Sequence, residues 1–329
     1  MKAITYYTYG SADVLQLEEI EKPSPKEDEV LIKIYASTVN RTDCGFRNPE
    51  YQFIKLISGI TKPKAKILGS EFAGVIEEIG KNVTRYKVGD KVFGLSTFSF
   101  GTHAEYICKK ETNSMAIMPT NYSFDEAAAV CDGLMLAYAN IRKIDFCTPK
   151  KILINGATGS IGISALQLCK YFGATVTAVG NTKNLALLKS LGADKVFDYL
   201  NEDFTKEEFL SEEDKYDVVF DAVGKSTFSK CKPLLKPKGI YFSTELGPYA
   251  QNIPLALTTP LFNGRHVKFP IPKDHYDDIL LFNRIIEEGK FKAIIDKTYT
   301  LEQVPDAHRY VELGEKTGNV VIRNMNYEI

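Results

Sequence analysis

Over its first 118 residues the chain alternates short apolar runs with polar turn segments. The runs at 30–35, 73–79 and 91–94 have the length and the β-branched content of strands. Six glycines between residues 69 and 101 favour tight bends between or within these strands. The pattern predicts a β-rich, tightly bent small barrel.

The pattern changes near residue 119. Ser123 and Glu126 have the spacing of a capping box ahead of the apolar run 127–130, which predicts the start of a helix. From there to about residue 265, apolar runs of strand length alternate with stretches of helical periodicity. Such alternation predicts an α/β fold with a doubly wound parallel sheet, in which ligands bind at the carboxyl ends of the strands.

After residue 266 the pattern predicts a short strand, two helices at 276–288 and 301–313, and a closing strand at 319–323. A segment this short cannot bury a core of its own, so we expect it to pack on the first domain. The predicted organisation is a β-rich domain from residues 1–118 and 266–329, and an α/β domain from residues 119–265.

A glycine-rich turn joins the first strand of the α/β region to its first helix. The apolar run Ile152–Ile154 predicts a buried strand, and the glycines at 156, 159 and 162 follow it with the spacing G-x-x-G-x-x-G. A helix from about Ser160 and a strand at 175–180 complete a βαβ unit. Free backbone N–H groups and the positive end of the helix dipole predict a phosphate site at this turn. The alternative is a turn that only lets the helix pack closely on the strand.

Composition narrows the choice of partners. The chain has 329 residues, 25% of them charged, and a net charge of −1, which gives no reason to expect a nucleic acid or an anionic membrane surface as partner. None of its six cysteines has C-x-x-C spacing, so we expect reduced thiols. With no apolar signal core and no run of about 18 apolar residues, we expect a cytoplasmic protein.

Three further segments carry a resemblance to a known family. They are Gly69–Val75, Val88–Gly94 and Leu191–Tyr199, and together with the glycine turn they resemble the medium-chain dehydrogenase/reductase superfamily. The resemblance spans the whole chain and is strongest to the zinc-independent, quinone-oxidoreductase-like branch. It implies a GroES-like barrel, a Rossmann domain, an active site in the cleft between them, and a homodimer. It also implies hydride transfer from NADPH to a quinone or an α,β-unsaturated carbonyl.

The residues at the metal positions of the superfamily argue against zinc. Where zinc-dependent alcohol dehydrogenases carry a cysteine and a histidine, this chain has Asn40 and Ser70, and only Cys131 matches the third position. A catalytic zinc needs about three ligands of the Cys, His or carboxylate type, so we expect no metal, although Asp43 and Glu71 lie nearby in the matched pattern.

The resemblance places Asn40 against the nicotinamide or the substrate carbonyl, where its amide group donates a hydrogen bond. The alternative is an amide that caps a turn after the preceding strand. Tyr51 is a second candidate donor, and an aromatic residue at an interface is the alternative. Met135 stands where many relatives have threonine near the nicotinamide amide, which puts that hydrogen bond in question.

The end of the second strand predicts NADPH as the cofactor. An NAD-binding unit has Asp or Glu about 20 residues after the glycines, whereas the stretch Ala178–Lys183 contains no carboxylate. Lys183 supplies positive charge for a 2′-phosphate, and Asn181 and Thr182 supply hydrogen bonds; the alternative is a Lys183 that points into solvent. By resemblance, Tyr199 lies near the same phosphate or the adenine. The predicted cofactor-binding residues are Thr158, Gly159, Ser160, Ile161, Gly162, Asn181, Lys183, Tyr199 and Ala222.

Two other functions stay open at this point. One is an NADPH-binding structural or regulatory protein with little activity, and the other is a zinc-type alcohol dehydrogenase. The Tyr-x-x-x-Lys string of short-chain dehydrogenases occurs at Tyr51 and at Tyr106, but both copies precede the glycine turn, and we interpret them as chance matches.

Overall fold

The computed structural model describes residues 1–49, 52–97, 99–209, 211–262 and 264–324. The chain divides into two compact units: unit 1 comprises Met1–Asp132, Asp274–Gly289 and Ala293–Ile329, and unit 2 comprises Gly133–Lys273 and Lys290–Lys292. The segment after residue 273 therefore rejoins the first unit, as predicted for the tail. Within the described part of the chain, no helix combines the length and the apolar character that a membrane span requires.

Unit 1 is built on a seven-stranded sheet in the order β14-β15-β3-β4-β5-β7, with β6 paired to β3, and on a separate β1-β2 pair. Only the β14-β15 pairing in the larger sheet is parallel. The strands of unit 1 are β1 (Lys2–Thr5), β2 (Gln16–Glu19), β3 (Glu29–Val39), β4 (Glu71–Ile79), β5 (Lys91–Leu95), β6 (Tyr106–Lys110), β7 (Met115–Ile117), β14 (Ile295–Thr300) and β15 (Asn319–Arg323). Its helices are α1 (Arg41–Arg47), α2 (Gln52–Ser58), α3 (Phe124–Ala128), α9 (Tyr276–Glu287) and α10 (Val304–Glu312).

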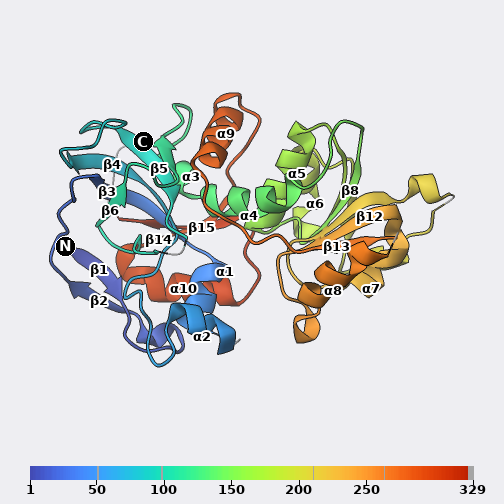
Figure 1. Ribbon diagram of the computed structural model, residues 1–329, viewed down its shortest axis with the longest axis horizontal. Helices are drawn as coiled ribbons and strands as arrows, with labels where there is room; N and C mark the ends of the chain where they lie inside the picture. Colours follow the sequence, from blue (N-terminus) through green and yellow to red (C-terminus); the bar gives the residue numbers. More distant parts are fainter. Residues whose placement is uncertain (50–51, 98, 210, 263, 325–329) are drawn as a thin grey trace. The chain divides into compact units, whose positions relative to one another are not determined.

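Unit 2 is a doubly wound parallel sheet in the order β10-β9-β8-β11-β12-β13, the Rossmann arrangement 3-2-1-4-5-6 in chain order. Its strands are β8 (Lys151–Asn155), β9 (Thr175–Gly180), β10 (Lys195–Asp198), β11 (Tyr216–Asp221), β12 (Leu235–Ser243) and β13 (His266–Lys268). Its helices are α5 (Ser160–Tyr171), α6 (Leu185–Ser190), α7 (Phe228–Cys231) and α8 (Asn252–Thr258), and α4 (Cys131–Ile141) begins at the junction of the units. Helices α5 and α6 lie on one side of the sheet, and α7 and α8 on the other (Figure 1). The predicted fold class is confirmed.

The compact units divide later in the sequence than residues 118/119 and 265/266. The capping box at Ser123 and Glu126 is present, but the helix that it starts, α3, contacts β3 and β4 of unit 1. Strand β13 pairs in parallel with β12 and is the sixth strand of the unit 2 sheet, whereas the sequence places it in the returning segment. A three-residue strand carries no period that identifies its sheet, so pairing decides its place.

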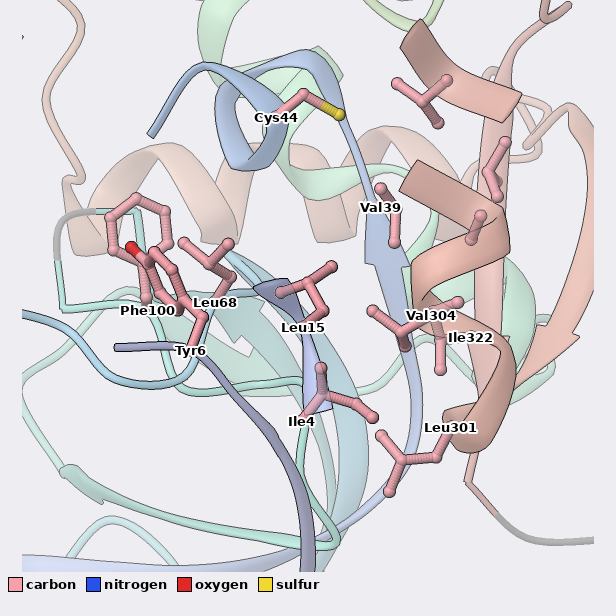
Figure 2. Close-up of a cluster of buried hydrophobic side chains, with 13 residues drawn as sticks. Ile4, Tyr6, Leu15, Val39, Cys44, Leu68, Phe100, Leu301, Val304 and Ile322 are labelled. Atoms are coloured by element: carbon pink, nitrogen blue, oxygen red, sulfur yellow. The ribbon is translucent and has the colours of Figure 1, made fainter. Parts of the chain in front are cut away.

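The core of unit 1 explains why the tail returns to it. Buried apolar side chains from both ends of the chain pack together, among them Ile4, Leu15, Val304 and Ile322 (Figure 2). Each of these aliphatic side chains contributes roughly 1.5–3 kcal/mol by leaving water. The last strand and helices are thus held by the N-terminal residues as well as by the sheet.

Two histidines lie buried beside this core. The ring of His103 is fully buried, its Nε2 lies 2.8 Å from the carbonyl oxygen of Thr38, and its ring centroid lies 5.7 Å from that of His308. Because a carbonyl only accepts hydrogen bonds, Nε2 carries the proton. Burial lowers the pKa of His103 to about 4, and it also lowers the pKa of His308.

Acidification is expected to destabilise the protein through His103. Between pH 6.5 and 4 the unfolded chain binds a proton at this residue that the folded chain does not, so the free energy of unfolding falls as the pH falls. The loss approaches about 3 kcal/mol at pH 4. Urea unfolding of the wild type and of His103→Gln, which keeps a donor for Thr38, tests this: the wild type's advantage must shrink towards pH 4. A constant difference, or the same change in the exposed His275→Gln control, would refute it.

Candidate active site

Two of the three glycines in the turn after β8 are required by the fold. Gly156 has a φ of +75°, a conformation that side chains rarely adopt. A Cβ at Gly162 would lie 2.2 Å from the carbonyl oxygen of Gly156, so only glycine lets α5 start this close to the turn. For these two positions, the packing interpretation of the motif accounts for the glycine.

Gly159 is different, because nothing in the described structure requires a glycine there. It is the N-cap of α5, with φ −78° and ψ 169°, and no side chain caps the helix. The only described atom within 4 Å of a Cβ at this position would be the carbonyl oxygen of Gly156, at 3.8 Å. Packing in the described structure therefore does not explain why this residue is glycine, and Thr158, Ser160 and Ile161 next to it are partly exposed.

The turn lies where the strand order of the sheet reverses. Strands β8 and β11 are neighbours here, and α5 and α7 leave them on opposite faces, which is where doubly wound sheets bind ligands. The backbone N–H of Ala222 donates to the carbonyl oxygen of Asn155 (3.0 Å), and the side-chain amide of Asn155 donates to the buried carboxylate of Asp221 (3.0 Å). These bonds fix the two strand ends, and with them the predicted position of Ala222.

At the end of β9 the structure brings together three more predicted residues. Asn181 lies directly after β9, and its Oδ1 is buried with no hydrogen-bond partner among the described residues. Lys183 is exposed, and no ion-pair partner for it occurs in the described part of the chain. Tyr199 is 53% exposed, and its backbone N–H donates to the carbonyl oxygen of Gly180 (3.0 Å). An orphaned polar atom, a free cation and an aromatic ring thus surround one strand end.

One predicted phosphate donor has another partner in the structure. The hydroxyl of Thr182, which the sequence predicts to donate to a cofactor phosphate, donates to the carboxylate of Asp198 (2.5 Å). Asp198 ends the neighbouring strand β10 and pairs in register with Gly180. The segment 178–183 contains no carboxylate, but Asp198 on the neighbouring strand places one beside it in space.

Asn40 is a helix cap in the structure. Its Oδ1 accepts from the backbone N–H of Asp43 (3.0 Å), the carboxylate of Asp43 accepts from the backbone N–H of Asn40 (3.0 Å), and its Nδ2 donates to Ser70 Oγ (2.8 Å). The capping alternative is thus present at α1, and the side chain of Asn40 also makes a hydrogen bond to the buried carboxyl group of Glu71. Tyr51, the other catalytic candidate, lies outside the described residues.

These contacts do not fit a catalytic zinc. Asn40 and Ser70 are bonded to each other, and the thiol of Cys131 donates to the carbonyl oxygen of Ala127 (3.7 Å). Burial raises the pKa of Cys131 well above its usual range, which disfavours the thiolate that a metal requires. Nowhere in the described chain do three His, Cys, Asp or Glu side chains meet in a metal-binding group.

Three buried carboxyl groups lie close to one another near Asn40, those of Asp43, Glu71 and Asp132. The sequence did not predict that they meet. Glu71 accepts from the hydroxyl of Thr38 (2.5 Å) and from the backbone N–H of Asp132 (2.6 Å). Burial raises the pKa of Asp43 and that of Glu71 to about 7, and it raises the pKa of Asp132 well above its usual range. Asp132 follows a helical alanine run with no motif around it, so nothing in the sequence marked it.

Family models match both halves of the chain. Residues 26–150 match the model described as an alcohol dehydrogenase GroES-like domain, and residues 191–322 match the one described as a zinc-binding dehydrogenase. The chain is 36% identical to a 2-methylene-furan-3-one reductase of Solanum lycopersicum, over 98% of this chain and 79% of that protein. It is 33% identical to a chloroplastic NADPH-dependent alkenal/one oxidoreductase of Arabidopsis thaliana, with the same coverage.

A solved structure of a quinone oxidoreductase has a similar fold. The quinone oxidoreductase from Coxiella burnetii superposes with a TM-score of 0.86 at 26% identity and covers 99% of both chains. The fold, the uncapped helix start at Gly159 and the free groups at the end of β9 define a dinucleotide-binding protein of the Rossmann class. The chain belongs to the medium-chain dehydrogenase/reductase superfamily, in its quinone-oxidoreductase-like branch, as the sequence predicted.

Proposed function

We propose that this protein is an oxidoreductase that uses NADPH to reduce quinones or α,β-unsaturated carbonyl compounds. The observation that carries the proposal is the helix start at Gly159, which no side chain caps and where the packing of the described residues does not require glycine. The names of the tomato and Arabidopsis relatives, a furanone reductase and an NADPH-dependent alkenal/one oxidoreductase, support the same substrate class.

The residues of unit 2 have defined tasks in this proposal. The backbone N–H groups of Ser160, Ile161 and Gly162 bind the pyrophosphate at the positive end of α5. Lys183 offsets the charge of the 2′-phosphate, the free Oδ1 of Asn181 accepts a hydrogen bond from the cofactor, and Tyr199 covers the phosphate or the adenine. The cofactor supplies the hydride, from C4 of its nicotinamide ring.

In the substrate site, Asn40 is the proposed donor to the carbonyl oxygen. Its amide is buried and is held by hydrogen bonds with Asp43, Ser70 and Glu71, so its orientation is fixed. Such a preorganised donor stabilises the charge that builds up on the oxygen as hydride arrives. Tyr51 is the proposed second donor by resemblance to the family.

The reaction is proposed to proceed without zinc, because two of the three metal positions hold Asn40 and Ser70, which are hydrogen-bonded to each other and are not of the Cys, His or carboxylate type. A homodimer is part of the proposal. It is supported by the exposed side chains of Leu257, Leu261 and Phe262, which lie on α8 and on the turn after it, before the edge strand β13.

A cytoplasmic location is also proposed, and the six free cysteines are in keeping with a reducing compartment.

The purified protein is expected to oxidise NADPH when given 9,10-phenanthrenequinone or an alkenal, and to retain this activity in strong chelator. It is expected not to oxidise simple primary alcohols, because no group at the metal positions lowers the pKa of an alcohol. Steady-state kinetics over this panel, with metal analysis, decide the matter. NADPH binding without turnover favours the structural or regulatory alternative, and one zinc per chain with ethanol oxidation favours the alcohol dehydrogenase.

A further inference from the structure

A carboxylate lies beside the end of β9, although the sequence of β9 contains none. Asp198, the last residue of β10, accepts hydrogen bonds from Thr182 Oγ1 (2.5 Å), Asn201 Nδ2 (2.7 Å) and the backbone N–H of Leu200 (3.1 Å). Its side chain is almost completely covered, with 5% of the residue exposed. It links the turn that carries Lys183 to the turn that begins at Tyr199.

These contacts fix both the charge and the hydrogen-bonding capacity of Asp198. The hydrogen bond from Thr182, followed by those from Leu200 and Asn201, holds the pKa of its carboxyl group below the usual range, so the group is ionised at neutral pH. Its oxygens already serve three donors, and the proton of the Thr182 hydroxyl is used by this carboxylate. Asp198 is therefore a negative charge held in place by protein donors, which occupy about three of its four acceptor sites.

We propose that Asp198 is a specificity-determining residue that limits the preference for NADPH over NADH. This inference rests on the proposed function, since it concerns the site at the end of β9. Asp198 acts in two ways: it places a negative charge next to the turn that receives a 2′-phosphate, and it withdraws the Thr182 hydroxyl from that phosphate. Lys183, exposed on the same turn, then provides attraction that Asp198 partly cancels.

The alternative is that Asp198 is a structural clamp, whose hydrogen bonds only hold the two turns in their conformations. A clamp without an electrostatic role would affect NADPH and NADH alike when it is altered, since both share the adenosine and the pyrophosphate. A charge beside the 2′-phosphate affects only the cofactor that carries this phosphate. The ratio of the two affinities, rather than either one alone, separates the alternatives.

The test measures dissociation constants of NADPH and NADH in the wild type, Asp198→Asn and Thr182→Val, with 2′,5′-ADP and 5′-AMP as competing fragments. Asparagine keeps the size of the side chain, removes the charge, and presents an amide N–H that Thr182 accepts, which releases the hydroxyl proton for the phosphate. We expect Asp198→Asn to raise the NADPH-to-NADH affinity ratio about 3- to 30-fold, with the larger gain at low salt. Thr182→Val is expected to change the wild-type ratio less than about twofold, because the hydroxyl already serves Asp198.

An unchanged or lower ratio in Asp198→Asn overturns the proposal. Should that variant not fold, Thr182→Val decides: a tenfold loss of NADPH affinity would show that the hydroxyl binds phosphate and that Asp198 does not withdraw it. The proposed function fails separately, if the wild type binds neither cofactor. Binding of both cofactors by the wild type, with no change of the ratio in either variant, refutes the role of Asp198 alone.

Discussion

Replacing Gly159 by serine is expected to lower the affinity for NADPH by about tenfold or more while leaving the fold as stable as before. The backbone at this position has the extended φ and ψ of an N-cap, and a Cβ there would touch nothing closer than 3.8 Å. Serine is among the preferred N-cap residues, so its hydroxyl satisfies N–H groups at the start of α5 and stabilises the helix. Those are the groups that the proposed pyrophosphate needs.

Gly162→Ser is the matched comparison within the same turn. Its Cβ would lie 2.2 Å from the carbonyl oxygen of Gly156 and 2.6 Å from Cα of Ala157, so the backbone must move. We expect a loss of about 3 kcal/mol of unfolding free energy or a protein that does not fold. Cofactor titration and urea unfolding of both variants test the pair. Equal losses of stability, or unaltered NADPH affinity in Gly159→Ser, would contradict the assignment of the helix start.

Glu312→Ala is expected to destabilise the protein by about 3 kcal/mol, because it leaves the charge of Arg47 buried without its partner. Arg47, at the end of α1, has a fully buried side chain that pairs with Glu312 at the end of α10. Its Nε donates to the carbonyl oxygen of Gly10 (3.1 Å), and its Nη1 has no partner among the residues described. Water reaches Glu312, whose side chain is 36% exposed, but not the guanidinium.

Two comparisons isolate the buried charge. Replacing both partners, with Arg47→Met and Glu312→Leu, is expected to recover most of the lost stability, since no uncompensated charge remains. Arg309 on the same helix pairs with Asp13, and both side chains are at least half exposed, so Arg309→Ala is expected to cost less than about 1 kcal/mol. Thermal or urea unfolding of the four proteins tests this. A double variant as unstable as Glu312→Ala would mean that shape, rather than charge, dominates at this position.

Periodicity and capping signals predicted most of the secondary structure. Strand β9 covers the predicted residues 175–180, the capping box at Ser123 starts α3, and the turn after β8 leads into a helix at Ser160. These signals are local, because they depend on residues within one turn of helix or one strand. Predictions that depended on which elements meet were less secure: β13 and α3 lie in other units than the predicted boundaries imply.

For the site, the sequence by itself located the glycine turn before α5, predicted a phosphate site there with Lys183 as its cation, and identified the family, since these signals lie in short stretches of the chain. Only the tertiary structure decided what surrounds them. It showed that packing explains Gly162 but not Gly159, that Asn40 is a cap bonded to Ser70, and that Asp198 reaches Thr182 from a neighbouring strand. The physical reason is that hydrogen bonds and charge interactions depend on distance in space, and residues on paired strands can be neighbours while lying about one supersecondary unit apart in the chain.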